Sequence, residues 1–143
     1  MADGIQQLTD TVHWTDLNSF FARGGKVLYY HGTSDPYFSA LDTLDYYQRM
    51  AKDSGGMDMV RAQFSRFYYV PGMLHCRGGP SLDSFDLLGA VVDWVERGKA
   101  PEGVAATGRA FSGRSRPLCP WPQHAQYKGQ GNSEDAANFT CAD

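Results

Sequence analysis

Two residues in this sequence have the chemistry of a catalytic acid–base pair. Asp35 lies in a short turn at residues 33–36, and His75 lies in the loop VPGMLHCRGGP at residues 70–80. A carboxylate that contacts an imidazole fixes its tautomer and stabilises its charged form, so that the ring can take a proton from a hydroxyl group. The pair therefore indicates acyl transfer, provided that the fold brings the two side chains together.

Each of these two residues follows a segment that predicts a β-strand. KVLYYHG (26–32) is apolar almost throughout, which is typical of a strand covered on both faces. FSRFYYVP (64–71) is a second strand-like run. We expect helices at residues 14–23, at 39–53 behind a capping box, and before Gly98. This order predicts an α/β fold with parallel strands, in which ligand sites lie at the carboxyl ends of the strands.

The helix before Gly98 carries an apolar stripe that we expect to face the core. The stripe consists of Phe85, Leu88, Val91, Val92 and Val95. Two strands alone do not make a stable sheet, and strands this apolar need neighbours. The chain is therefore expected either to dimerise extensively or to be the C-terminal part of a larger α/β domain.

The character of the sequence changes at residue 99. Residues 1–98 form the α/β part with Asp35 and His75, whereas residues 99–143 are rich in Gly, Pro, Ser and Gln and show no periodicity. We expect this second part to be an irregular tail packed on the core. A disulfide between its two cysteines, Cys119 and Cys141, would close a loop of roughly 20 residues and stabilise the tail by about 3 kcal/mol.

A serine nucleophile for the acid–base pair is missing from the chain. In α/β-hydrolases the nucleophile comes first, on a G-x-S-x-G turn, followed along the chain by Asp or Glu and then by His. None of the serines in this sequence has glycines at both flanking positions, and none lies on a strand-to-helix turn before Asp35. Cys76 could replace the serine, but adjacent side chains such as those of His75 and Cys76 usually point apart, which disfavours this role.

The composition is that of one small globular domain. The chain has 143 residues, of which 42% are hydrophobic, and its net charge of −3 gives no reason to expect nucleic acid or an anionic membrane as partner. No apolar run is long enough to span a bilayer, and the first residues, MADGIQQLTD, do not form a signal peptide. The three cysteines match no zinc pattern, and in an exported protein their odd number suggests an intermolecular partner or a free thiol.

Three stretches of the chain resemble the C-terminal third of the tannase and feruloyl esterase family, which includes hydrolases of mono(2-hydroxyethyl) terephthalate. They are YHGTSDPYFSALDTLDYY, FYYVPGMLHCRGGP with DSFDLLGAVVDWVERGKAP, and RPLCPWPQHAQYKGQGNSEDAANFTC. The resemblance covers nearly all of residues 14–143. The His-Cys dipeptide in its Gly-rich loop and the RPLCP…FTC ending are its most specific features.

The resemblance implies a secreted or periplasmic serine esterase with an α/β-hydrolase core, which cleaves gallate, ferulate or terephthalate monoesters. It implies that Asp35 is the triad acid, His75 the base, and Cys76 the partner of a cysteine just before the nucleophilic serine. That cysteine, the serine and a lid with a structural calcium would lie in a missing N-terminal portion, while Cys119 and Cys141 would pair with each other. This chain alone is expected to be inactive and to hold no cofactor or metal.

Three further residues, His31, Tyr37 and Phe38, are candidates for contact with an aromatic substrate, although each could serve in packing instead. Asn138 begins a glycosylation sequon that matters only in a eukaryotic source. Two other hypotheses stay open: a non-catalytic remnant or complementing subunit that needs a partner chain, and a cytosolic α/β-hydrolase of another branch. The last predicts three free thiols per chain, whereas the family resemblance predicts one.

Overall fold

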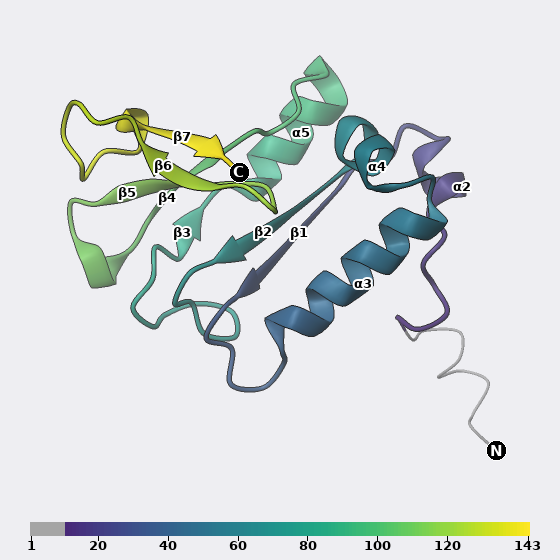
Figure 1. The fold of residues 1–143 in the computed structure, drawn as a ribbon, viewed down its shortest axis with the longest axis horizontal. Coiled ribbons are helices and arrows are strands. Elements are labelled where there is room, and N and C mark those ends of the chain that lie inside the picture. The colour runs from purple at the N-terminus through teal and green to yellow at the C-terminus, as the bar shows by residue number, and fades with distance from the viewer. Residues whose placement is uncertain (1–10) are drawn as a thin grey trace.

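The computed structural model describes residues 11–143, so the expectation about a signal peptide in the first ten residues lies outside this range. Figure 1 shows two long strands in the middle of the molecule, with helix α3 on one side and the C-terminal strands on the other. These strands, β1 (Val27–Gly32) and β2 (Ser65–Val70), pair in parallel, with Gly32 opposite Val70. Both strands end at the same edge, so the loops that follow them leave the sheet together.

Two helices connect β1 to β2. The first, α3 (Ala40–Asp53), begins at the predicted N-cap Ser39, whose side chain accepts a hydrogen bond from the backbone NH of Leu41 and not from that of Asp42 as a capping box would require. The second, α4 (Met57–Gln63), was not expected from the sequence. Both helices contribute to one apolar cluster on this side of β2, formed by Tyr47, Met50, Ala51, Val60, Phe64 and Phe67.

The strand β2 is covered on both faces, whereas β1 is not. Alternate residues of β2 enter the cluster on the α3 side and a second cluster on the other side, formed by Tyr68, Val70, Met73, Ala106 and Leu118. On β1, Tyr30 is 48% exposed, and no strand of the described residues pairs with its outer edge. The expectation of burial on both faces, which concerned the segment that forms β1, is therefore wrong within this chain, whereas β2 is buried on both faces.

The expectation that residues 99–143 are irregular is wrong. β4 (Val104–Thr107) pairs with β3 (Ser84–Phe85) and with β5 (Ser115–Leu118), and β6 (His124–Tyr127) pairs with β7 (Phe139–Ala142), all antiparallel. Two short 3₁₀ turns, η1 (Arg109–Phe111) and η2 (Ala136–Asn138), connect these strands. Strands of two to four residues are too short for alternation to be recognised in a sequence.

The C-terminal strands pack along the core and are cross-linked to each other. The backbone NH of Trp121 donates to the carbonyl of Phe67 on β2 at 2.8 Å, and Leu118 lies in the second apolar cluster. A disulfide joins Cys119 to Cys141, with their Cα atoms 5.4 Å apart. The predicted pairing of these two cysteines is confirmed.

The helix expected at residues 14–23 forms only one turn, α2 (Asn18–Phe21). The polar groups before it bond instead to the end of α3: the hydroxyl of Thr15 donates to Asp53, and the backbone NH of Leu17 donates to Ser54. These bonds hold residues 15–17 against the end of α3, and the helix begins only after them.

Helix α5 (Leu87–Arg97) turns a different face to the molecule than the apolar stripe predicted. Leu88, Val92 and Val95 are 74%, 40% and 57% exposed. Trp94 is buried instead, with the guanidinium of Arg66 4.9 Å from its ring centroid. These three stripe residues therefore lie on the surface within this chain, whereas Phe85, which precedes the helix on β3, packs against the second apolar cluster.

Candidate active site

The ends of β1 and β2 are tied together by backbone hydrogen bonds. The NH of Thr33 donates to the carbonyl of Val70 at 3.1 Å, and the NH of Ser34 donates to the carbonyl of Met73 at 3.0 Å. Gly32 allows this close approach, because a Cβ atom there would lie 2.3 Å from the carbonyl oxygen of Met73. The two loops are thus held side by side where Asp35 and the histidine loop begin.

The carboxylate of Asp35 is held from two sides. Its Oδ1 accepts hydrogen bonds from the backbone NH groups of Tyr37 at 2.8 Å and Phe38 at 3.1 Å. Its Oδ2 lies 2.8 Å from Nδ1 of His75, and the side chain is only 2% exposed. Burial opposes ionisation, but the hydrogen bonds from His75, Tyr37 and Phe38 outweigh it and lower the pKa of Asp35 to about 2.

The imidazole of His75 has one nitrogen bound and the other open. An ionised carboxylate only accepts hydrogen bonds, so Nδ1 carries the proton and Nε2 is left as an acceptor. Within residues 11–143, Nε2 has no hydrogen-bond partner, and the side chain is 46% exposed. An imidazole in this state can take a proton from an approaching hydroxyl group.

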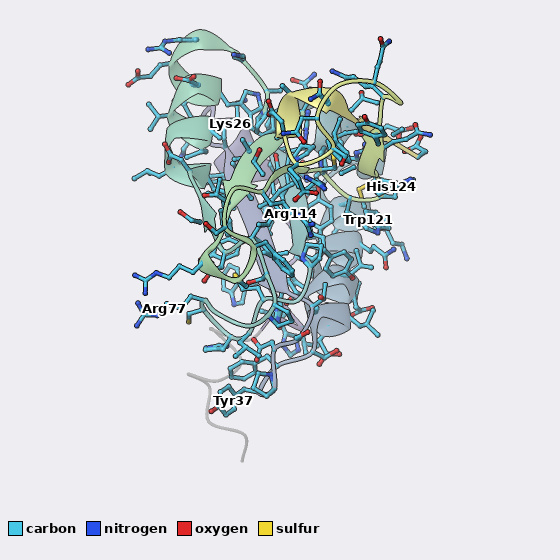
Figure 2. All side chains as sticks on the ribbon, turned by 90° about the vertical axis from the view of Figure 1, so that its left-hand side faces the viewer. Lys26, Tyr37, Arg77, Arg114, Trp121 and His124 are labelled. Atoms are coloured by element: carbon cyan, nitrogen blue, oxygen red, sulfur yellow. A yellow bond between two sulfur atoms is a disulfide. The ribbon has the colours of Figure 1, made fainter. Side chains whose placement is uncertain are left out.

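Two exposed aromatic side chains flank the imidazole. The ring centroids of Tyr37 and Phe38 lie 5.7 Å and 5.3 Å from that of His75, and the residues are 76% and 62% exposed. Figure 2 shows Tyr37 projecting at one end of the molecule, away from Trp121 and His124. The structure therefore brings both predicted substrate contacts beside the imidazole, on the solvent side.

The remaining predicted residues have different surroundings. His31 is 13% exposed and directs both ring nitrogens at protein atoms: Nδ1 lies 2.8 Å from the hydroxyl of Thr43, and Nε2 lies 3.3 Å from Oδ2 of Asp35. Cys76 is exposed and forms no disulfide within the described residues. The role of Thr43 was missed, because nothing in the spacing marks one threonine of a helix as a partner of a distant histidine.

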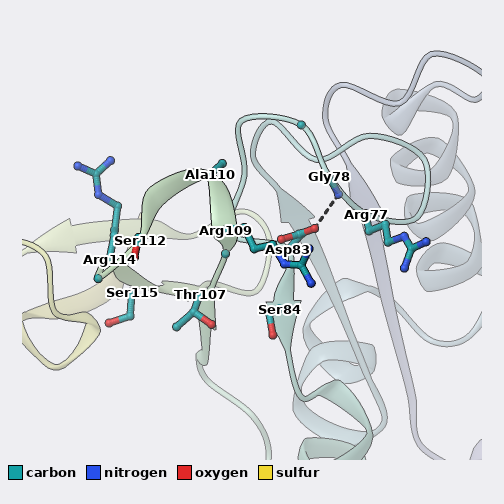
Figure 3. A pocket seen from close by; sticks show the side chains of 13 residues that line it. Arg77, Gly78, Asp83, Ser84, Thr107, Arg109, Ala110, Ser112, Arg114 and Ser115 are labelled. Atoms are coloured by element: carbon teal, nitrogen blue, oxygen red, sulfur yellow. Dashed lines mark hydrogen bonds between the residues drawn. The ribbon is translucent and has the colours of Figure 1, made fainter.

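A broad hollow lies next to the histidine loop, between that loop and the turn before β5 (Figure 3). Its wall includes Arg77 and Arg109, and the backbone NH of Gly78 donates to Asp83 at 2.6 Å. This hydrogen bond holds the Gly-rich segment after Cys76 against the start of β3. The hollow was not expected from the sequence, because residues 99–143 were assigned no regular structure.

The described residues offer no metal site. No group of three or more His, Cys, Asp or Glu side chains in residues 11–143 is arranged to hold a metal ion. The resemblance places its structural calcium in a lid that this sequence does not contain, so no calcium is expected among these residues. Among the same residues, no helix has the length and apolar character needed to cross a bilayer.

Comparison with known proteins gives consistent matches. The family model described as "Tannase and feruloyl esterase" matches residues 1–142. The mono(2-hydroxyethyl) terephthalate hydrolase of Piscinibacter sakaiensis is 50% identical over 133 residues, which are 90% of this chain and 21% of that protein. Two solved structures from Aspergillus oryzae also match: an esterase (TM-score 0.76, 33% identity) and feruloyl esterase B (TM-score 0.72, 31% identity).

These matches cover most of this chain and a small part of the others. The two solved structures cover 96% and 90% of the chain, which corresponds to 31% and 29% of their own lengths. The chain thus spans between about a fifth and a third of the proteins it matches. On the match across residues 1–142, the chain belongs to the tannase and feruloyl esterase family.

Proposed function

We propose that this chain supplies the acid and the base of a serine-type carboxylic ester hydrolase that acts on esters of aromatic acids. The observation that carries the proposal is the 2.8 Å hydrogen bond between Oδ2 of Asp35 and Nδ1 of His75, which leaves Nε2 open. The order of acid and base along the chain is that of an α/β-hydrolase triad. The serine would come from a preceding portion of the same hydrolase.

In this mechanism His75 moves protons and Asp35 stays ionised. Nε2 of His75 takes the proton of the serine hydroxyl as its oxygen attacks the ester carbonyl carbon, and the imidazolium then gives this proton to the leaving alcohol. Water repeats the sequence on the acyl-enzyme: Nε2 takes a proton from water as the water oxygen attacks the acyl carbon, and the serine oxygen then leaves with this proton, which releases the acid. The low pKa of Asp35 keeps its charge next to Nδ1 through both steps.

Cys76 would anchor the histidine loop to the nucleophile turn. Its thiol is exposed and follows His75 directly, so it is accessible to a cysteine that approaches with the serine. A disulfide there would hold the base and the hydroxyl within reach of each other. The bond would belong to the complete site, since its second cysteine is not in this sequence.

The surfaces of this chain support the view that it completes a larger α/β-hydrolase core. The outer edge of β1 is unpaired within the described residues, and Tyr30 on it is exposed. The exposed stripe on α5, formed by Leu88, Val92 and Val95, is apolar. Further strands beside β1 and packing against the stripe would remove this surface from water. The chain alone is therefore proposed to have no esterase activity.

Substrate class and compartment are inferred from the same features. Tyr37 and Phe38 offer exposed aromatic rings beside the base, which suits an aromatic acyl group or its ester. The relatives named above as a terephthalate monoester hydrolase and a feruloyl esterase act on esters of this kind. The disulfide between Cys119 and Cys141 favours an oxidising compartment, either secreted or periplasmic.

A chimera tests the proposal. This chain replaces the matching stretch of the P. sakaiensis hydrolase, and turnover of mono(2-hydroxyethyl) terephthalate and methyl ferulate is measured. We expect hydrolysis that falls by about 10³-fold or more in His75→Ala, and no change in His124→Ala, whose side chain is exposed on β6. A folded chimera that is inactive, or one in which His75→Ala stays active, would contradict the proposal.

A further inference from the structure

We infer that His31 is a positioning residue that holds the carboxylate of Asp35 toward His75, and that it does not bind substrate. This inference rests on the proposed function and changes the role of His31 from the one expected from the sequence. It is carried by the contacts around Asp35, in which two imidazoles meet one carboxylate oxygen.

Beyond its three hydrogen bonds, the carboxylate of Asp35 contacts a second imidazole, that of His31. A carboxylate offers about four lone-pair positions. Two backbone NH groups occupy those of Oδ1, and Nδ1 of His75 occupies one at Oδ2. Nε2 of His31 lies 3.3 Å from Oδ2, close enough for an electrostatic contact with this carboxylate, which is only 2% exposed, while the hydrogen bond of Nε2 goes to the carbonyl of Phe38 at 3.2 Å.

The partners of His31 decide its tautomer. Nε2 faces two groups that can only accept, Oδ2 of Asp35 at 3.3 Å and the carbonyl of Phe38 at 3.2 Å, so Nε2 carries the proton. Nδ1 then accepts from the hydroxyl of Thr43 on α3 at 2.8 Å. With both nitrogens used and 13% of the side chain exposed, the ring has no polar atom left for a substrate.

This network connects the acid to two rigid elements. His31 lies on β1 and Thr43 on α3, so the carboxylate is held from the strand and the helix as well as from its own turn. Removing the ring takes away the contact of Nε2 with Oδ2 and the hydrogen bond to the carbonyl of Phe38, and lets the pair of Asp35 and His75 shift. Misplacement of a catalytic group by about 1 Å can cost about 100-fold in rate, while substrate binding through other residues is unaffected.

Two substitutions in the chimera separate positioning from substrate binding. His31→Leu removes the donor, and we expect kcat to fall about 10- to 100-fold with KM within about threefold. His31→Gln can place an amide NH near the position of Nε2, and we expect kcat within about fivefold of the parent. His124→Leu is the matched control. Loss of kcat in both variants alike, a rise in KM with kcat unchanged, or no effect of His31→Leu would overturn the inference.

Nitrogen NMR of the 143-residue chain tests the same contact without activity. For neutral His31 we expect the proton on Nε2. In His31→Leu we expect the His75 Nδ1–H resonance to change, and thermal unfolding of the variant is measured to check that it is folded. A proton on Nδ1 of His31, or a His75 resonance that does not respond, would overturn the inference. If the parent chimera is inactive but the spectra are as expected, the proposed function is contradicted, whereas the contact between His31 and Asp35 is not.

Discussion

The substitution Asp35→Asn tests how the acid controls the base. The Asn side chain has the size of Asp but exchanges one acceptor oxygen for an NH₂ group. Its oxygen must face the backbone NH groups of Tyr37 and Phe38, because the opposite orientation sets NH₂ against two donors that lie 2.8 Å and 3.1 Å from the Asp35 oxygen. The NH₂ group then points at Nδ1 of His75, 2.8 Å away in the parent.

An NH₂ group can only donate, so Nδ1 of His75 must become the acceptor and its proton moves to Nε2. The nitrogen that should take the serine proton is then already protonated. Loss of the correct tautomer in a catalytic triad costs about 10⁴-fold in kcat. We expect a loss of this size in the chimera.

The assay is the initial rate of mono(2-hydroxyethyl) terephthalate hydrolysis, with kcat and KM determined separately. Asp45→Asn, at a position 67% exposed on α3, is the matched control and should leave both constants unchanged. A folded Asp35→Asn chimera with kcat within tenfold of the parent would refute the reasoning about the tautomer.

Three further predictions concern the chain itself. Thiol titration of the denatured, unreduced chain should find one thiol, that of Cys76, and two more after reduction of the Cys119–Cys141 bond; three before reduction would mean that this bond is absent in the protein. Tyr68→Phe removes a buried hydroxyl that donates to a backbone carbonyl at 2.9 Å and should lower the free energy of unfolding by about 1–3 kcal/mol in urea titrations; an unchanged midpoint would contradict this hydrogen bond. The pKa of Asp35 is lowered from 3.8 to about 2, so the folded state binds a proton at this carboxylate less readily than the unfolded state does. The ionised carboxylate therefore contributes its full stabilisation above about pH 4, and this stabilisation is lost as the pH falls toward 2. The urea midpoint should fall over this interval in the parent and fall less in Asp35→Asn, and equal falls would argue against the low pKa.

The central contact of the site could be predicted from the sequence because it follows from a simple rule. Asp35 and His75 each follow an apolar run, and adjacent parallel strands end at one edge, so the loops after them meet. The helix α3 could be predicted equally well, because Ser39 caps it and the glycines at 55 and 56 follow its end.

Other parts depend on packing that a sequence pattern does not contain. The stripe on α5 has helical periodicity, but periodicity does not say what covers it, and here Trp94 is buried instead of Leu88 and Val92. The C-terminal strands are short and are fixed by the disulfide and by contact with β2. The contact of His31 with Asp35 depends on the side-chain conformation of one histidine at a strand end, which no spacing could reveal.

The protonation of His75 is the most direct test of the account. Nitrogen NMR of the neutral ring in the 143-residue chain should find the proton on Nδ1, held in a hydrogen bond with Asp35, and should find it on Nε2 in Asp35→Asn. A proton on Nε2 in the parent, or identical spectra for parent and variant, would contradict the claim that this carboxylate sets the state of the base.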